Sequence, residues 1–137
     1  MDFLSFEMRV QLAVGAALEV DSKAVLHEAT MHSDYGCIRC IFSGKDGETI
    51  TVKVENDNKT SVSKSSWSWV AHPIEWPTSL NYSTARALFD EEFPKTSWST
   101  VVLRQRSEHP SVGAEYVFTV AGGYVVVDVP TKIAYSR

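Results

Sequence analysis

The apolar residues near the start of the sequence recur every three or four positions, which is the spacing of one face of a buried helix. They are Phe3, Phe6, Val10, Ala13, Val14, Ala17 and Leu18. Leu4, Met8 and Leu12 widen this stripe, so we expect a largely buried helix over residues 3–20. The polar pair Asp21-Ser22 ends the pattern.

Beyond residue 22 the period changes to two, which predicts strands over residues 23–32, 35–43 and 48–56. Asp46-Gly47 predicts the hairpin turn between the last two of them. Residues 60–69 continue in an extended pattern that is polar except for Val62 and the tryptophans. The serines of this stretch offer little apolar area, so we expect it at an edge or rim of the sheet.

The second half of the chain repeats this order of elements. Ser83 is the expected N-cap of a helix over residues 83–93, which Pro94 ends. Alternating patterns then predict strands over residues 97–106, 114–121 and 124–129 and a short one over 131–136, with Gly122-Gly123 as a turn. Each half therefore places a glycine hairpin after a helix.

These patterns predict an α+β fold, with a mostly antiparallel sheet and two helices packed on one face. We expect a single domain, 1–137, in which helix–strand halves of about 1–70 and 80–137 form a pseudo-repeat joined by a Trp/Pro-rich link. In element order this plan is similar to tandem helix-plus-sheet enzyme inhibitors, small secretion chaperones and cystatin-like curved sheets. That likeness is architectural and implies no function by itself.

Composition narrows the function classes. The 137 residues are 44% hydrophobic and 22% charged, with a formal net charge of −4, as in an ordinary acidic globular protein. Nucleic-acid binding is disfavoured because no strong basic cluster is present. No stretch approaches the roughly 20 apolar residues of a membrane span. Asp2 and Glu7 stand where a secretory signal would carry basic residues, which predicts a cytoplasmic protein.

Candidate chemistry is sparse. His27, His32, Cys37 and Cys40 are potential metal ligands, but residues three apart on a strand point to opposite faces, so Cys37 and Cys40 do not converge on one ion. A redox pair is disfavoured because no helix follows the two cysteines. No nucleophile motif or catalytic carboxylate pair is recognisable. The sequence thus predicts no catalytic residue, no metal and no cofactor, and favours a protein that is not an enzyme.

Three of the four tryptophans lie close together in mid-chain, at Trp67, Trp69 and Trp76, with Pro73 and Pro77 beside them. One interpretation is that all three rings cap the core of the sheet. The other leaves at least one ring partly exposed on a stiff connection, where tryptophan supplies a large contact area at low entropic cost. The serine-rich setting favours the second interpretation.

Our leading hypothesis is a small non-catalytic intracellular protein that binds a protein partner, as an inhibitor, immunity factor or chaperone does. A homodimer is also expected, since edge strands pair readily. The proposed binding residues are Trp67, Trp69, Trp76, Asp90, Glu91 and Glu92. The alternative is a ligand-binding curved sheet, with possible enzymatic use, whose apolar pocket between sheet and helix is lined by Trp98, Tyr116, Phe118 and Tyr124.

Overall fold

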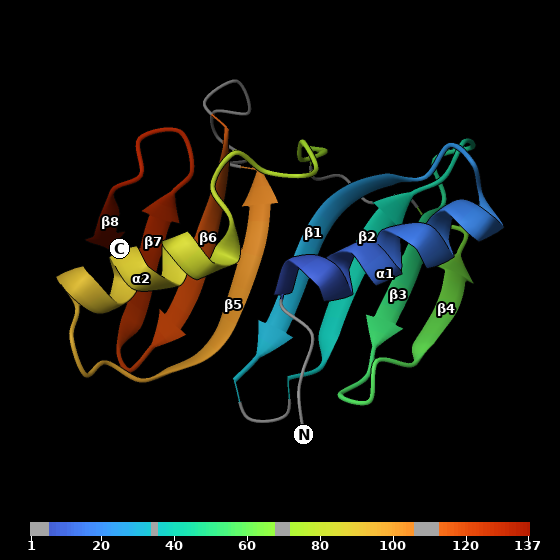
Figure 1. Ribbon diagram of the computed structural model, residues 1–137. Helices are drawn as coiled ribbons and strands as arrows, with labels where there is room; N and C mark the ends of the chain where they lie inside the picture. Colours follow the sequence, from blue (N-terminus) through green and yellow to red (C-terminus); the bar gives the residue numbers. More distant parts are fainter. Residues whose placement is uncertain (1–5, 34–35, 68–71, 106–112) are drawn as a thin grey trace.

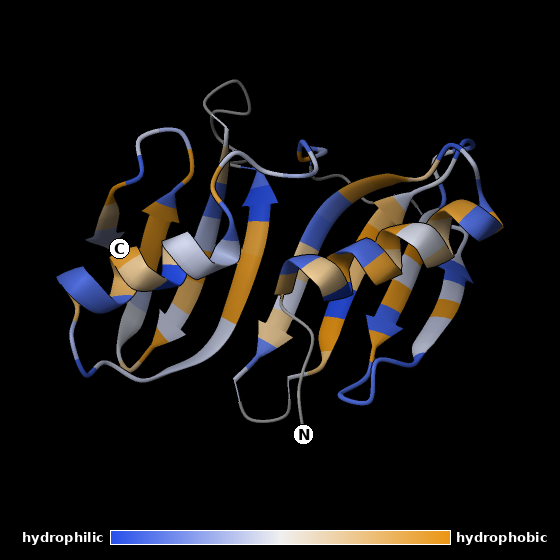
Figure 2. Ribbon diagram, in the orientation of Figure 1, coloured by the Kyte–Doolittle hydropathy of each residue, from blue (hydrophilic) through white to orange (hydrophobic). Residues whose placement is uncertain are grey.

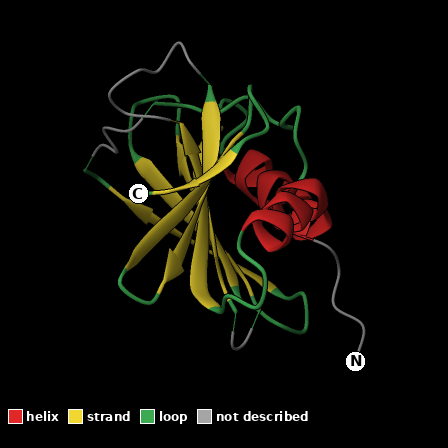
Figure 3. Cartoon of the chain, turned by 90° about the vertical axis from the view of Figure 1, so that its left-hand side faces the viewer, coloured by secondary structure: helices red, strands yellow, loops and turns green. Residues whose placement is uncertain are grey.

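The computed structural model describes residues 6–33, 36–67, 72–105 and 113–137, in which two helices cover one face of an antiparallel sheet (Figures 1 and 3). The first half contains α1 (Phe6–Val20), β1 (Val25–His32), β2 (Ile38–Ser43), β3 (Thr49–Val54) and β4 (Thr60–Ser65). The second contains α2 (Tyr82–Glu92), β5 (Trp98–Gln105), β6 (Ala114–Val120), β7 (Gly123–Asp128) and β8 (Ala134–Ser136). The predicted α+β class and the repeated order of elements are confirmed.

The strands form one sheet in the order β4-β3-β2-β1-β5-β6-β7-β8. The halves meet where β1 pairs antiparallel with β5, with Thr30 opposite Val102 and Glu28 opposite Arg104. Within each half the strands follow one another as hairpins, and the predicted turns contain Gly47 and Gly122 at φ 81° and 82°. The expectation that the serine-rich strand is an edge is confirmed, because β4 has a neighbour on one side only.

Helix α1 packs on β2, β3 and β4 through Phe6, Val10, Ala13 and Ala17. The prediction that Met8 and Leu12 are buried with them is wrong: these side chains are 55% and 38% exposed. They lie on parts of the helix surface that the sheet does not reach, since a helix on a sheet buries only one stripe.

One charged residue of α1, Arg9, is buried, which the hydrophobic periodicity of the sequence did not predict. Arg9 is 2% exposed, and its Nη2 donates to the main-chain oxygens of Val54 and Glu55, both at 2.8 Å. Its Nη1 donates to the carbonyl of Gly36. The guanidinium therefore joins the helix to the end of β3 and to the connection before β2. Desolvation lowers the pKa of Arg9.

The N-cap of helix α2 lies two residues earlier than predicted. Asn81, and not Ser83, is the N-cap: its side chain accepts from the Thr84 N–H at 2.9 Å. Both residue types serve as N-caps, so the sequence did not distinguish them. The helix ends at Phe93, whose N–H donates to Phe89, and Pro94 follows.

The core lies between sheet and helices, where apolar and polar positions alternate along the strands (Figure 2). In the second half it is aromatic: the Phe118 ring lies 4.6 Å from Phe89 and 5.5 Å from Trp98, between ring centroids. The predicted pocket between sheet and helix is not supported, because Tyr116 and Phe118 are fully buried in this packing. Tyr124 is excluded from that layer, since it alternates with the buried Val125 and is half-exposed.

The opposite face of the sheet carries a row of charges. Glu28, Arg104 and Glu115 are partners in register across β1, β5 and β6. Glu115 is buried between two arginines, with Arg104 Nε at 3.2 Å and Arg137 Nη2 at 3.1 Å. Burial is tolerated here because the carboxylate is paired on both sides.

Candidate functional site

Residues 72–81, the described part of the connection between β4 and α2, are called the link here and are held against the sheet. The Ile74 N–H donates to the Leu26 oxygen of β1 at 3.0 Å, and the side chains of Ile74 and Leu80 are buried. Trp76 is half-buried against the core, and its Nε1 donates to Gln11 Oε1 of α1 at 3.0 Å. The main-chain N–H of Tyr82 donates to the Glu7 carboxylate. The link therefore has a fixed path, as the flanking prolines suggest.

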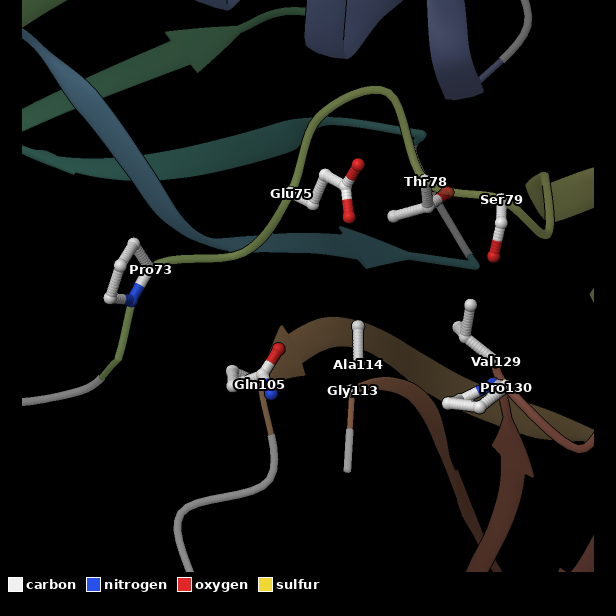
Figure 4. A pocket seen from close by; sticks show the side chains of 9 residues that line it. All are labelled: Pro73, Glu75, Thr78, Ser79, Gln105, Gly113, Ala114, Val129 and Pro130. Carbon is white, nitrogen blue, oxygen red and sulfur yellow. The ribbon is translucent and has the colours of Figure 1, made fainter. Parts of the chain in front are cut away.

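This fixed path forms one wall of a cavity of about 370 Å³. We name it the link cavity and define it by its lining residues, which are Pro73, Glu75, Thr78, Ser79, Gln105, Gly113, Ala114, Val129 and Pro130. Figure 4 shows the link residues on one side and the ends of β5, β6 and β7 on the other. Cavities of a few hundred Å³ at such junctions are where small ligands bind.

The wall opposite the link is rigid. Gly113 has φ +110°, and a Cβ at this position would lie 2.5 Å from Pro130 Cγ, so the backbone conformation and the close approach both require glycine. The Val129 N–H donates to the Ala114 oxygen at 3.0 Å, which fixes the two strand ends together. The cavity is thus bounded by prolines and by a hydrogen-bonded strand pair.

Behind the cavity lies a neutral polar cluster. The hydroxyls of Thr78 and Tyr116 each donate to the Leu80 oxygen at 2.8 Å. Burial raises the pKa of Tyr116 to about 12, so its phenol stays protonated at neutral pH. The hydroxyls of this cluster are committed to Leu80, which leaves charge recognition to another residue of the lining.

Glu75 supplies the charge of the link cavity. Its side chain is exposed, and within the described part of the chain no hydrogen bond or ion pair involves its carboxylate. Among the described residues, the lining contains no lysine or arginine to neutralise it. The cavity therefore combines one anionic group with hydroxyl and amide neighbours and with apolar walls.

The residues predicted to form one binding surface occupy separate places. Trp67 follows β4 and is 57% exposed, and its main-chain oxygen accepts from the Thr49 hydroxyl at 2.7 Å. Trp69 lies outside the described residues. Trp76 is in the link, next to the cavity residue Glu75.

The acidic residues Asp90, Glu91 and Glu92 end α2, which packs on β7 and β8 at the opposite edge of the sheet from Trp67 (Figure 1). Asp90 pairs with Arg86 Nε at 3.2 Å. Glu91 and Glu92 line a groove of about 260 Å³ beside Ile133. The structure thus does not bring the acidic run to the tryptophan side of the sheet.

The cysteines and histidines offer little reactive chemistry. Burial raises the pKa of Cys40 far above its usual range, and burial together with Glu55 raises that of Cys37. Sequence reasoning missed one pair: His27 Nε2 and Ser43 Oγ are 2.8 Å apart across β1 and β2. Neither residue lines the link cavity. Because the two residues are 16 positions apart in the sequence, no local motif indicated this contact.

In the described residues, neither helix has the length and apolar character needed to cross a membrane. The sequence matches no protein-family model and no curated protein. The fold is similar to the crystal structure of a protein from Clostridium difficile 630 that is described as a "putative lipoprotein". The TM-score is 0.73 at 9% sequence identity, over 100% of this chain and 96% of that chain. At this identity the match establishes the fold alone.

The comparison corrects two predictions. The matching protein is described as a lipoprotein, which is a class of membrane-anchored or extracellular proteins and not of intracellular inhibitors, immunity factors or chaperones. The assignment of this chain to the cytoplasm, and to that class of binding protein, is therefore withdrawn. The acidic residues Asp2 and Glu7, on which the predicted location rests, do not decide where the protein is located.

Proposed function

We propose that the chain is a ligand-binding domain that takes a small organic cation, an ammonium or guanidinium group on a short apolar body, in the link cavity. The observation that carries the proposal is the exposed Glu75 carboxylate in a cavity of about 370 Å³ whose described lining residues include no cation. Pro73, Val129 and Pro130 supply apolar contacts for the body of such a ligand.

The magnitude of binding follows from the exposure of Glu75. A solvent-exposed ion pair contributes at most about 1 kcal/mol. The charge of Glu75 therefore contributes more to specificity for a cation than to affinity. A fragment-sized cation should bind with a dissociation constant of roughly a millimolar. A natural ligand with more contacts would bind more tightly through the apolar walls.

The test is an amide NMR titration with n-butylammonium, n-butanol and butyrate, which share an alkyl chain and differ in charge. We expect n-butylammonium to shift the amide signals of Ser79, Gln105 and Ala114, and Glu75→Gln to abolish the shifts. Glu19→Gln, at an exposed carboxylate of α1, is the matched control and should leave them unchanged. Equal binding of butanol, or no loss in Glu75→Gln, would contradict the proposal.

A second candidate function is contact with a protein chain at the edge of the sheet. Trp67 is 57% exposed and directly follows the edge strand β4, which favours such a contact at this place. This surface is separate from the link cavity, so both functions are compatible with one fold. A β4-edge variant such as Val62→Lys should lose that contact and keep n-butylammonium binding.

A further inference from the structure

Strand β4 is an edge strand with few of the features that normally protect edges. It pairs with β3 over six residues without a shift in register, whereas the β1–β2 and β5–β6 pairings are interrupted. Residues Thr60 to Lys64 are all exposed. The strand contains no proline and one charged residue, Lys64. A regular, weakly charged edge is a template for pairing with another strand.

Helix α1 extends this edge with apolar side chains. Glu7 and Gln11 face the link, because they accept from Tyr82 and Trp76. Leu12, Ala16 and Val20 are spaced by four residues and lie on the opposite side of the helix. That side faces the β3–β4 edge, as the bonds from Arg9 to the end of β3 show.

Three exposed apolar residues lie at this edge. Leu12 and Val62 are each 38% exposed, and Val20 is exposed as well. We name these three side chains, together with the backbone of Thr60–Ser65, the β4 edge patch. An added strand beside β4 would lie under the side of α1 that carries Leu12 and Val20.

We infer that the occupant of the β4 edge patch is a second copy of this chain, with the two β4 strands antiparallel about Val62; this inference rests on the second candidate function above. Residues that oppose each other in an antiparallel pair point to the same face. A twofold axis at Val62 satisfies this condition and places Val62 opposite its counterpart. Thr60 then opposes Lys64 of the other copy.

The match of polar with polar and apolar with apolar residues favours this register. Val62 meets Val62 of the other copy, and Lys64, the sole charge of β4, meets the polar Thr60. With a rise of about 3.4 Å per residue, the two Lys64 positions are about 14 Å apart along the strands. An axis at Ser63 would instead set each Lys64 against Val62, which is apolar.

The pairing also continues the helix layer. Because opposed residues of the two β4 strands point to the same face, both α1 helices lie on the same side of one joined sheet. The two strands are then about 4.8 Å apart. Leu12 and Val20 of each copy then face the other copy across the shared edge. The partner is thus the same patch turned by a twofold axis, as in an isologous dimer.

Cysteine cross-linking tests the register, in a Cys37→Ser background because Cys40 is fully buried. Val62→Cys should form a disulfide-linked dimer under mild oxidation, since opposed Cβ atoms lie about 5 Å apart. Thr60→Cys, on the same face, should not, because the two cysteines would be about 14 Å apart. Equal cross-linking of both variants would overturn the inference.

Sedimentation tests the association itself. The full chain should change from monomer to dimer across a roughly hundredfold range of concentration. Val62→Lys should raise the dimer dissociation constant by at least about tenfold, because it opposes two cations at the axis. A chain that stays monomeric throughout overturns the second-copy inference, including when its β4 edge binds a foreign segment. The n-butylammonium titration is independent of both results.

Discussion

The two halves share one order of elements but differ in how they cover their apolar surface. In the second half, α2 and β5–β7 enclose an aromatic cluster, and no large apolar residue of α2 is exposed. In the first half, α1 leaves Met8, Leu12, Leu18 and Val20 exposed, and Leu12 and Val20 lie on the side of the helix that faces β4. Helix α1 therefore leaves more apolar surface exposed than α2 does, and the contact proposed at β4 rests on this difference.

The outer ends of the sheet show the same contrast. β8 has three residues, and the main chain of the following Arg137 exchanges hydrogen bonds with Tyr124 at 2.8 and 3.2 Å. The Arg137 side chain reaches the buried Glu115. β4 is twice as long as β8, with six residues against three. A short edge strand offers little backbone for pairing, and a long regular one offers more.

The largest effect is expected in the second half. Phe118→Ala should lower the free energy of unfolding by about 4 kcal/mol, because it empties the centre of the aromatic cluster. Val62→Ala, at the β4 edge, should change it by less than about 0.5 kcal/mol at low protein concentration. Urea denaturation measures both. Similar costs would show that the first half is packed as tightly there as the second.

Arg9→Met should cost about 3 kcal/mol, because it removes the donor to the buried carbonyl of Val54 and to the partly buried carbonyl of Glu55. Arg86→Met, on the surface of α2, is the matched control and should cost about 1 kcal/mol or less. Urea titrations of the two variants give the difference. A cost for Arg9→Met below that of the control would mean that α1 is held by its apolar stripe alone.

Glu115→Gln should cost about 2 kcal/mol, because it removes the buried charge shared by Arg104 and Arg137. Asp90→Asn, which breaks the exposed pair with Arg86, should cost less than about 0.5 kcal/mol. Thermal unfolding followed by circular dichroism compares the two. If both substitutions are neutral, the end of the sheet at β8 is not stabilised by this carboxylate.

Glu28 gives the smallest expected effect, at the junction of the halves. Burial raises its pKa in the folded state, against the opposing effect of Arg104 and Arg39. Because the pKa of Glu28 is raised in the folded state, its protonated side chain contributes to the stability of the fold at pH values below the unfolded pKa. This contribution is lost as the pH rises through the folded pKa. Glu28→Gln should therefore stabilise the protein at neutral pH, by less than about 1 kcal/mol given its partial exposure. The difference in free energy of unfolding between Glu28→Gln and the unsubstituted chain should vanish in acid, where Glu28 is protonated. Urea denaturation at several pH values measures it, and stabilisation that persists in acid would contradict this account.

The sequence predicted those features that depend on local pattern. The period-two stretches, the turns at Gly47 and Gly122, and the polar character of β4 each follow from residues close together in the chain. The pairing of β1 with β5 was not predictable, because alternation does not specify which strand lies beside which.

Three features of the structure could not be predicted from the sequence, each for a physical reason. Arg9 is buried because three carbonyls converge on it from distant segments, and a charged residue in a helix is ordinarily assigned to solvent. The link cavity combines residues from the link and from the ends of three strands, so no local motif marks Glu75. Leu12 and Met8 fit the apolar stripe but extend past the sheet that would cover them.

The contrast between the two edges is tested most directly by amide hydrogen exchange of β4 and β8 at low and high protein concentration. Pairing between copies should slow exchange in Thr60–Ser65 as concentration rises, while Ala134–Ser136 exchanges at the same rate throughout. Exchange in β4 that is independent of concentration would contradict the claim that this edge is completed by another chain.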